Sequence, residues 1–354
     1  MRPIRWALSL ILAVGIGAAP VAHAQEGESK CRYGVFSFYL ENDLFYHSDR
    51  NYTSGIKFSW VSPDLADFTS EKCLPPLLKP AEQKIRELLR PDSFSGALSR
   101  NVVVSIGQEI YTPGDRERRD VIRNDRPYAG WLYLGLGYNK RFRAFDPWVE
   151  RLDSTELRLG MIGPASLAQQ AQNLVHDARG FPRFLGWGNQ LRNEPGAQLI
   201  LERKYKARTG TGDWIAHFGG SAGTVATYLN AGLEMRAGVG IPDDFGSSPA
   251  RPAGNNTAPG SFPAGARPSD RRGAHLFAAL DARAVARDIF LDGNTFVHSH
   301  HVEKRPFVGD LALGAAVFAG GWKFSYARVL RSREFEGQTS RQSFGSFTVS
   351  STFD

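Results

Sequence analysis

The chain has 354 residues, a formal net charge of +7 and 12% aromatic residues. Its mean hydropathy is -0.31, and beyond the N-terminal segment no stretch of about 18 apolar residues occurs, which excludes an α-helical membrane protein. The basic residues are spread along the chain instead of forming a tail. For an exported protein this distribution predicts an anionic lipid, and not a nucleic acid, as the partner.

The first residues have the pattern of an export signal. Arg2 and Arg5 precede an apolar core over 6–19, and Ala22-His23-Ala24 gives a small-x-small cleavage site. We expect residues 1–24 to be a signal peptide and residues 25–354 to form the mature protein. Cys31 and Cys73 would then lie in an oxidising compartment, where they could form a disulfide or remain two unpaired thiols.

Apolar and polar residues alternate with a period of two along most of the mature chain. From 276 to 289, alanine and leucine occupy one parity, while the other carries Asp281 and Arg283. After Asn51 the alternation predicts two faces of a strand: Tyr52, Ile56, Phe58 and Trp60 on one, and Thr53, Lys57 and Ser59 on the other. Such strands suit a soluble sandwich or a membrane barrel. The export signal favours the barrel.

Aromatic residues near predicted strand ends also favour the barrel, because such residues gather at membrane interfaces. These are Trp60, Trp131, Tyr133, Trp148, Trp214 and Trp322. We therefore predict an all-β fold, a twelve-stranded antiparallel transmembrane β-barrel in the outer membrane of a Gram-negative bacterium, with both termini periplasmic. The predicted strands are 33–41, 52–62, 101–111, 127–142, 148–163, 196–207, 213–226, 230–241, 274–291, 306–319, 321–334 and 343–353.

Two predicted periplasmic returns are unusually long. Residues 63–100 include a short amphipathic pattern around 81–89, which predicts a helix. Residues 242–273 are rich in proline, glycine, serine and asparagine, a composition typical of disorder. The other returns, among them the single residue 320, are short, as expected for the periplasmic side of a barrel.

The third outer loop, 164–195, predicts a short helix over 164–180. Its apolar residues share one helical stripe: Leu167, Ala171, Leu174, Val175 and Ala178. Gln172 and His176 are four residues apart and neighbours at the rim of this stripe. Such a helix at outer-leaflet height could hold acyl chains beside a polar reaction centre. The alternative is a structural helix whose histidine is only hydrogen-bonded.

Two other patterns carry less weight. Residues 219–223 match the G-x-S-x-G string of serine hydrolases, but they fall inside a predicted strand, whereas a nucleophile elbow needs a strand-to-helix turn. His298, His300 and His301 could suggest a metal patch, yet a solvated outer loop explains them equally well.

Several segments together resemble the lipid A 3'-O-deacylase (LpxR-type) family, in order and over nearly the whole mature chain. They are Glu41-Asn42-Asp43, Tyr52-Thr53-Ser54-Gly55, Arg126-Pro127-Tyr128-Ala129-Gly130-Trp131, Met161-Ile162-Gly163-Pro164, Gln172-Asn173-Leu174-Val175-His176, Asp292-Gly293-Asn294-Thr295-Phe296 and Glu334-Phe335-Glu336-Gly337-Gln338. The resemblance implies a twelve-stranded barrel that hydrolyses the 3'-acyloxyacyl ester of lipid A with the help of a divalent cation, chiefly Ca²⁺. It also implies that the protein acts on lipopolysaccharide.

The resemblance further implies a site. His176 would be the general base, with Asn42, Asp43, Thr53 and Gln172 around the reaction centre. Two family positions differ: a lysine of the second outer loop meets the arginine run Arg116, Arg118 and Arg119, and a glutamate shortly after the histidine meets Pro182.

The expected chemistry is ester hydrolysis by water. A histidine that is mostly neutral at pH 7 can accept the proton of the attacking water. A hard cation such as Ca²⁺ takes oxygen ligands, which Asp43 and Glu41 could supply. By parity we expect Glu41, Asp43 and Thr53 on the lumenal face, so His176 would meet them only if the third loop folds over the barrel mouth.

Arginines of the second and third loops would bind lipid A phosphates, for which bidentate guanidinium contacts are well suited. Arg116, Arg118 and Arg119 are the proposed phosphate contacts. We expect a monomer. Two other functions remain open, a calcium-dependent outer-membrane phospholipase and a non-enzymatic channel or surface-binding barrel.

Overall fold

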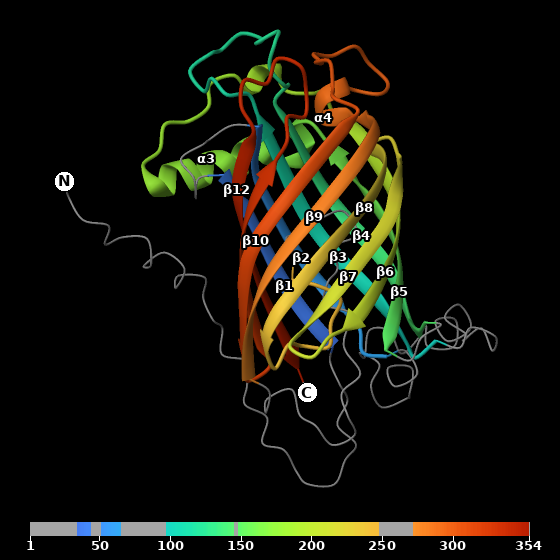
Figure 1. Cartoon of the computed structure of the whole chain (residues 1–354). Helices are drawn as coiled ribbons and strands as arrows, with labels where there is room; N and C mark the ends of the chain where they lie inside the picture. Colours follow the sequence, from blue (N-terminus) through green and yellow to red (C-terminus); the bar gives the residue numbers. More distant parts are fainter. Residues whose placement is uncertain (1–33, 44–50, 65–96, 145–147, 248–271, 354) are drawn as a thin grey trace, which may run out of the picture. The chain divides into compact units, whose positions relative to one another are not determined.

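The computed structural model describes residues 34–43, 51–64, 97–144, 148–247 and 272–353, and twelve strands among them close into an antiparallel barrel. Each strand pairs with its neighbours in sequence, and β1 pairs with β12 (Figure 1). The strands are β1 (Gly34–Asn42), β2 (Asn51–Val61), β3 (Ser99–Thr112), β4 (Ala129–Arg143), β5 (Val149–Ile162), β6 (Glu194–Arg208), β7 (Gly212–Gly223), β8 (Ala226–Val239), β9 (Arg272–Asp288), β10 (Phe307–Ala319), β11 (Trp322–Arg331) and β12 (Gln342–Phe353). The twelve-stranded barrel predicted from the sequence is confirmed.

Helices are few. They are α3 (Ala168–Arg179), α4 (Ile289–Asp292) and the 3₁₀ turns η3 (Pro164–Ser166) and η4 (Trp187–Asn189). In the part of the chain described, no helix has the length and apolar character needed to cross a membrane. The predicted signal peptide, the cysteines and the helix around 81–89 lie outside the described residues.

The alternation of side chains gives the barrel an apolar outside and a polar inside. In β4, Leu134 and Leu136 are more than 60% exposed, whereas Tyr133 and Asn139 are buried. In β5, the buried parity includes Glu156 and Arg158, joined by an ion pair of 3.0 Å. This arrangement is that of a membrane barrel, because lipid covers the exposed apolar side chains and the lumen holds the charges.

The aromatic positions divide between the two faces. Trp148, Trp214 and Trp322 are exposed at the end of the barrel that carries the chain termini, as an interfacial girdle requires. Trp131 and Tyr133, predicted at the interface, are instead buried in the lumen. Their parity in β4 is that of Asn139, and this parity faces inward.

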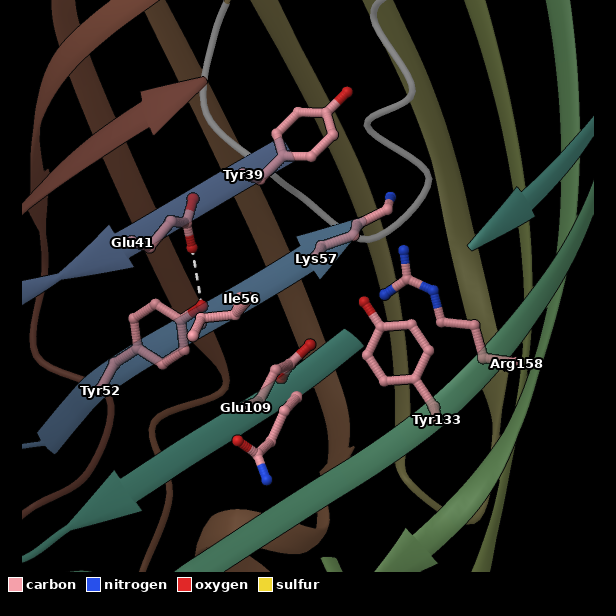
Figure 2. Close-up of a pocket in the computed structure, with 10 residues that line it drawn as sticks. Tyr39, Glu41, Tyr52, Ile56, Lys57, Glu109, Tyr133 and Arg158 are labelled. Atoms are coloured by element: carbon pink, nitrogen blue, oxygen red, sulfur yellow. Dashed lines mark hydrogen bonds between the residues drawn. The ribbon is translucent and has the colours of Figure 1, made fainter. Parts of the chain in front are cut away.

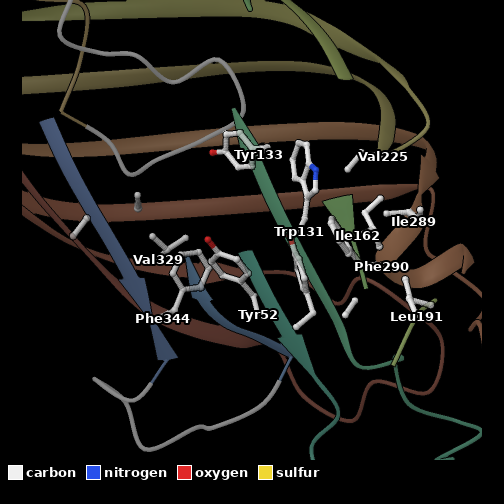
Figure 3. Packing of buried hydrophobic residues seen from close by; sticks show 14 of the residues in the cluster. Tyr52, Trp131, Tyr133, Ile162, Leu191, Val225, Ile289, Phe290, Val329 and Phe344 are labelled. Atoms are coloured by element: carbon white, nitrogen blue, oxygen red, sulfur yellow. The ribbon is translucent and has the colours of Figure 1, made fainter. Parts of the chain in front are cut away.

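The upper lumen is filled by apolar and aromatic side chains from strands all around the barrel. Tyr111 stacks on Phe290 with ring centroids 4.1 Å apart, and Tyr52 packs edge-on against Phe344 at 5.3 Å. Figure 3 shows Tyr52 and Phe344 on one side of this cluster and Phe290 on the other, beside Trp131 and Ile289. Strand 274–291 was predicted too long: β9 ends at Asp288, whose side chain accepts a hydrogen bond from Phe290 N and caps α4.

The opposite end of the lumen is occupied by residues 241–247, which we call the plug segment. Its Phe245 is 1% exposed and packs on Leu152, and Asp244 forms ion pairs with Arg236 and Lys323. Of the stretch 242–273, for which disorder was expected, 242–247 are thus ordered inside the barrel and 272–273 belong to β9. The remainder, 248–271, lies outside the described residues.

Candidate functional site

The helix that carries His176 begins after a tight turn and ends at a glycine. Leu167, with φ 58°, occupies the left-handed region at the N-terminus of α3, and among the described residues it is the one non-glycine with a positive φ. At the other end Gly180, with φ 70°, reverses the chain, and Phe181 N donates to the carbonyl of His176 at 2.8 Å. This C-terminal cap turns residues 181–187 back along the helix.

The helix lies on the outside of the barrel wall. In β3 and β4 the lumenal parity includes Glu109, Tyr111 and Trp131, so the alternate residues point outward. A Cβ built on Gly130, which has this outward parity, would lie 2.2 Å from Ala168 Cβ and from Ser166 Oγ. The absence of a side chain at Gly130 therefore lets the start of α3 rest directly on β4.

Other outward residues of β3 and β4 meet the same loop. Gln108 Nε2 donates to the Ser166 carbonyl at 2.6 Å. Ile110 and Tyr128, both buried, pack with Ala168, Phe184 and Trp187 in one cluster. Each large apolar side chain buried there contributes roughly 1.5–3 kcal/mol, which is sufficient to hold α3 against the wall. Figure 1 shows α3 lying across the barrel axis beside the end that carries the long loops.

This position corrects the expectation that the third loop folds over the barrel mouth. The face of α3 turned to the wall is Ala168, Gln172 and His176, at intervals of four residues. The apolar stripe, predicted to hold acyl chains, is largely exposed, with Leu174 71% and Leu167 51% exposed. Periodicity located the stripe correctly, but it faces away from the wall because small Ala168 and the polar Gln172 and His176 make the close contact.

The His176 ring is oriented by the returning chain. It is 1% exposed, and its Nδ1 lies 2.6 Å from the carbonyl oxygen of Pro182. A carbonyl oxygen only accepts hydrogen bonds, so Nδ1 carries a proton, and in the neutral ring the lone pair is then on Nε2. Phe184 packs edge-on against the ring at 5.8 Å. Pro182 lies near the position where the resemblance implies a glutamate, and its backbone carbonyl accepts the hydrogen bond from His176.

Gln172 is oriented by a second residue of the returning chain. Its Oε1 accepts a hydrogen bond from Trp187 Nε1 at 2.8 Å. An indole N–H can only donate, so the amide oxygen is fixed on the Trp187 side and the NH₂ group on the other. Within the described part of the chain Gln172 Nε2 has no hydrogen-bond partner, although Gln172 is only 5% exposed. Trp187 has no recognisable motif and was missed from the sequence.

The residues at the end of β1 separate onto two faces. Glu41 points into the lumen, where Oε2 accepts from Tyr52 at 2.7 Å and Oε1 from Ser346 at 3.4 Å. Asn42, the next residue, faces the other side of the wall by strand alternation, and Asp43 is 0% exposed. Glu41 and Asn42 therefore face opposite sides of the wall, and the pairing of Glu41 with Asp43 around one cation stays a prediction.

Tyr52 was predicted on the wrong face. The pairing of β2 with β3 shifts register between Tyr52 and Ser54, which marks a β-bulge. One extra residue in the strand reverses the parity beyond it, so Tyr52 joins Gly55 and Lys57 on the lumenal side. Of Thr53 the structure describes the backbone, at this bulge.

Glu41 and Tyr52 line a polar lumenal cavity with about 320 Å³ of empty space, part of it open to solvent. Figure 2 shows the two side chains facing each other beside Lys57 and Glu109. The cavity lies on the lumenal face of the wall whose outer face carries α3, because Glu109 and Ile110 are successive residues of β3. It is therefore separate from the His176 site.

The second outer loop is tied to the third through its backbone. Leu185 N donates to the Arg116 carbonyl at 2.9 Å, and Asn189 Nδ2 to the Arg119 carbonyl at 2.7 Å. The predicted phosphate contacts thus lie beside the helix-bearing loop. Arg118 forms an exposed ion pair with Asp120 at 2.6 Å, whose hydrogen bond lowers the pKa of Asp120 to about 2.

The two weaker sequence patterns are structural. Ser221 of the G-x-S-x-G string lies in β7 and faces the lumen, where its Oγ donates to the Ala226 carbonyl at 2.9 Å. His300 Nε2 lies 2.7 Å from the Asp125 carbonyl oxygen. Over the described ranges, no three histidine, cysteine, aspartate or glutamate side chains gather as a metal site.

The closed barrel with its apolar belt and polar lumen defines a class, the β-barrel proteins of the Gram-negative outer membrane. The family model described as "Outer membrane protein LpxR" matches residues 8–353. The chain therefore belongs to the LpxR family, as its motifs indicated.

A solved structure of the same family agrees on the fold. LpxR from Salmonella typhimurium superposes with a TM-score of 0.64 at 17% identity, covering 90% of this chain and 100% of that one. The translocator domain of the autotransporter NalP from Neisseria meningitidis has a TM-score of 0.40 at 11% identity, covering 91% of this chain and 87% of its own. No curated protein sequence matches this chain.

Proposed function

We propose that the protein is an outer-membrane esterase that hydrolyses the 3'-linked acyl or acyloxyacyl ester of lipid A. The observation that carries the proposal is a pair of buried polar side chains, Gln172 and His176, between an amphipathic helix and the lipid-facing side of the barrel wall. A lipid in the bilayer can approach this place sideways. It could not approach a lumenal site in this way.

His176 is the proposed general base. With Nδ1–H donated to Pro182, its Nε2 can accept a proton from water. The oxygen of that water bonds to the ester carbonyl carbon, and the bond between this carbon and the sugar oxygen then breaks. The released acid carries the water oxygen, and the proton on Nε2 passes to the sugar oxygen, which becomes a hydroxyl. The donor-bearing side of Gln172 suits a contact with the carbonyl oxygen.

The length of α3 supports a shared site with the ends of β1 and β2. Adjacent strands are about 4.8 Å apart, so β1 lies roughly 14 Å from β4 along the wall. His176 is eight residues beyond Ala168, which rests on β4, or about 12 Å along a helix axis. A helix across the strands therefore spans the distance needed to bring His176 to Asn42, Asp43 and Thr53.

The cation proposed for the site is Ca²⁺. Asp43 offers a buried carboxylate and Asn42 an amide oxygen, which are donors that a hard cation accepts. Glu41 does not fit, because it faces the lumen and both its oxygens accept hydrogen bonds. Such a cation supplies positive charge next to the ester oxygen as negative charge develops. Asp43 and Asn42 are the residues we propose to hold it.

The substrate class follows from the setting of the site. The loop that carries Arg116 and Arg119 is hydrogen-bonded to the helix-bearing loop. Guanidinium groups there suit the phosphates of lipid A. Arg118 contributes less, since Asp120 already neutralises it.

A channel is less well supported. Aromatic side chains fill the upper lumen and the plug segment occupies the other end. The described lumen is therefore largely filled, and the proposed site lies on the outer wall, where lipid is the expected partner.

The test is the mass of lipid A from a bacterium that makes it unmodified, after expression of the protein with Ca²⁺ present. Loss of the 3'-linked acyl group, abolished by His176→Ala and by chelation of the cation, supports the proposal. Unchanged lipid A with a folded barrel overturns it. A change in glycerophospholipids alone would support the phospholipase.

A further inference from the structure

The exposed side of α3 is sharply divided into an apolar and a polar flank. Successive helical residues are turned by about 100°, so both flanks can be placed relative to the wall-facing residues Ala168, Gln172 and His176. One flank consists of Leu167, Ala171, Leu174, Val175 and Ala178. The other consists of Gln169, Gln170, Asn173 and Asp177. If water surrounded all the free sides of the helix, polar residues would be expected on both flanks.

The apolar flank continues beyond the helix. Phe181 and Leu185 of the returning chain are 40% and 42% exposed, close to the 40% of Val175. This exposure is unusual for a loop in water, because large apolar patches on soluble surfaces are rare. It is the pattern of a helix that lies in a membrane interface, with one flank among acyl chains and one toward water.

The barrel itself supplies the lipid surface that the flank joins. Ile110 and Gly130, which α3 covers, share the outward parity of Ile106 and Leu134 further down the same strands. Ile106 and Leu134 are 46% and 63% exposed and belong to the lipid-facing belt. In β5, Met161 has the outward parity and precedes the chain's exit to Leu167. The flank of α3 is thus continuous with the belt.

We infer that α3 is an interfacial helix whose apolar flank is embedded among the acyl chains of the outer leaflet. Leu174 and Leu167 enter the acyl region, while Gln170 and Asp177 remain in the headgroup layer. The wall-facing residues then lie at the boundary between headgroups and acyl chains, about 5–10 Å into the leaflet surface. Ester bonds of lipids lie at that depth. The inference concerns the depth of the helix and does not require the proposed reaction.

Single nitroxide labels on the full-length protein test this depth. In a background with Cys31→Ser and Cys73→Ser, one cysteine replaces Val175, Gln170 or Leu134 in turn, and the labelled protein is reconstituted in vesicles of phospholipid and lipopolysaccharide. Accessibility to oxygen, which concentrates in acyl chains, is compared with accessibility to a water-soluble nickel complex. All three positions are exposed, so the labels need not disturb packing.

The label at Val175 should resemble the one at Leu134, with oxygen accessibility several-fold above that at Gln170, from which it is turned by about 140° around the helix. The label at Gln170 should be the more accessible to nickel. A label at Val175 that is as accessible to nickel as the one at Gln170 would overturn the inference. Because accessibility is measured at the label and not through product, this outcome leaves the proposed esterase to be judged by the mass of lipid A. Protease resistance of the barrel checks that each variant is folded.

Discussion

Gly130 offers a direct way to lift α3 from the wall. In Gly130→Ala the new Cβ would lie 2.2 Å from Ala168 Cβ and Ser166 Oγ, whereas carbon atoms in contact are about 3.5–4.0 Å apart. The helix must therefore move by more than about 1 Å. Overpacking of this kind costs typically 1–3 kcal/mol, and a displacement of about 1 Å at a reaction centre can cost about a hundredfold in rate.

The matched control is Gly309→Ala. Gly309 also lies in a barrel strand, but a Cβ there would meet only the Asp281 carbonyl oxygen at 3.8 Å, an ordinary contact. We expect Gly130→Ala to reduce lipid A deacylation, measured by mass spectrometry, about tenfold or more, and to increase hydrogen exchange in α3. Gly309→Ala should resemble the wild type. Wild-type activity and unchanged exchange in Gly130→Ala would refute the placement of α3 on β4.

Three further predictions concern Gln172, the arginine run and the plug segment. Trp187→Phe removes the N–H donor that orients Gln172. Loss of a hydrogen bond worth about 0.5–1.5 kcal/mol predicts a 2- to 12-fold lower rate of deacylation. In a Gln172→Ala background the same substitution should lower the rate no further, which a kinetic double-mutant cycle measures. Arg119→Ala should raise the KM for phosphorylated lipid A while leaving that for dephosphorylated lipid A unchanged; an equal effect on both would contradict phosphate binding. Asp244→Asn breaks buried ion pairs with Arg236 and Lys323, at a typical cost of 3–5 kcal/mol. This variant should exchange amide hydrogens faster in 241–247. The control Asp120→Asn, at a solvent-exposed ion pair, should leave that exchange unchanged.

The barrel could be predicted because its determinants are local. Alternation in segments such as 276–289 reflects lipid on one face and a polar lumen on the other, and this contrast holds along every strand. Strand ends were less predictable. The chain leaves β9 at Asp288 because a side-chain cap starts α4, although apolar residues continue through Leu291.

The faces near the site could not be predicted by alternation alone. The bulge between Tyr52 and Ser54 reverses parity within β2, and it depends on the partner strand β3. Glu41 consequently meets Tyr52 inside the lumen, although both residues belong to motifs of the family. A motif indicates which residues a family keeps together in sequence, but not which side of the wall they face.

The position of α3 was the main error of the sequence analysis. The apolar stripe was identified correctly and was interpreted as a place to hold acyl chains, with a structural helix as the alternative, but the third loop was expected over the barrel mouth. Beside the lipid-facing wall the apolar flank can still face lipid, while the polar Gln172 and His176 face the wall. Gly130, whose missing side chain makes room for Ala168, was the sequence signal that could have revealed this contact.

The central claim is that lipid A is bound on the outer wall of the barrel beneath α3. It is tested most directly with His176→Ala, the variant that the proposed reaction predicts to be inactive, and lipid A that carries a photoreactive group on its 3'-linked acyl chain. The account predicts cross-links to outward residues near the helix, such as Leu134 and Leu174. Cross-links to lumenal residues, such as Lys57 or Tyr133, would contradict it.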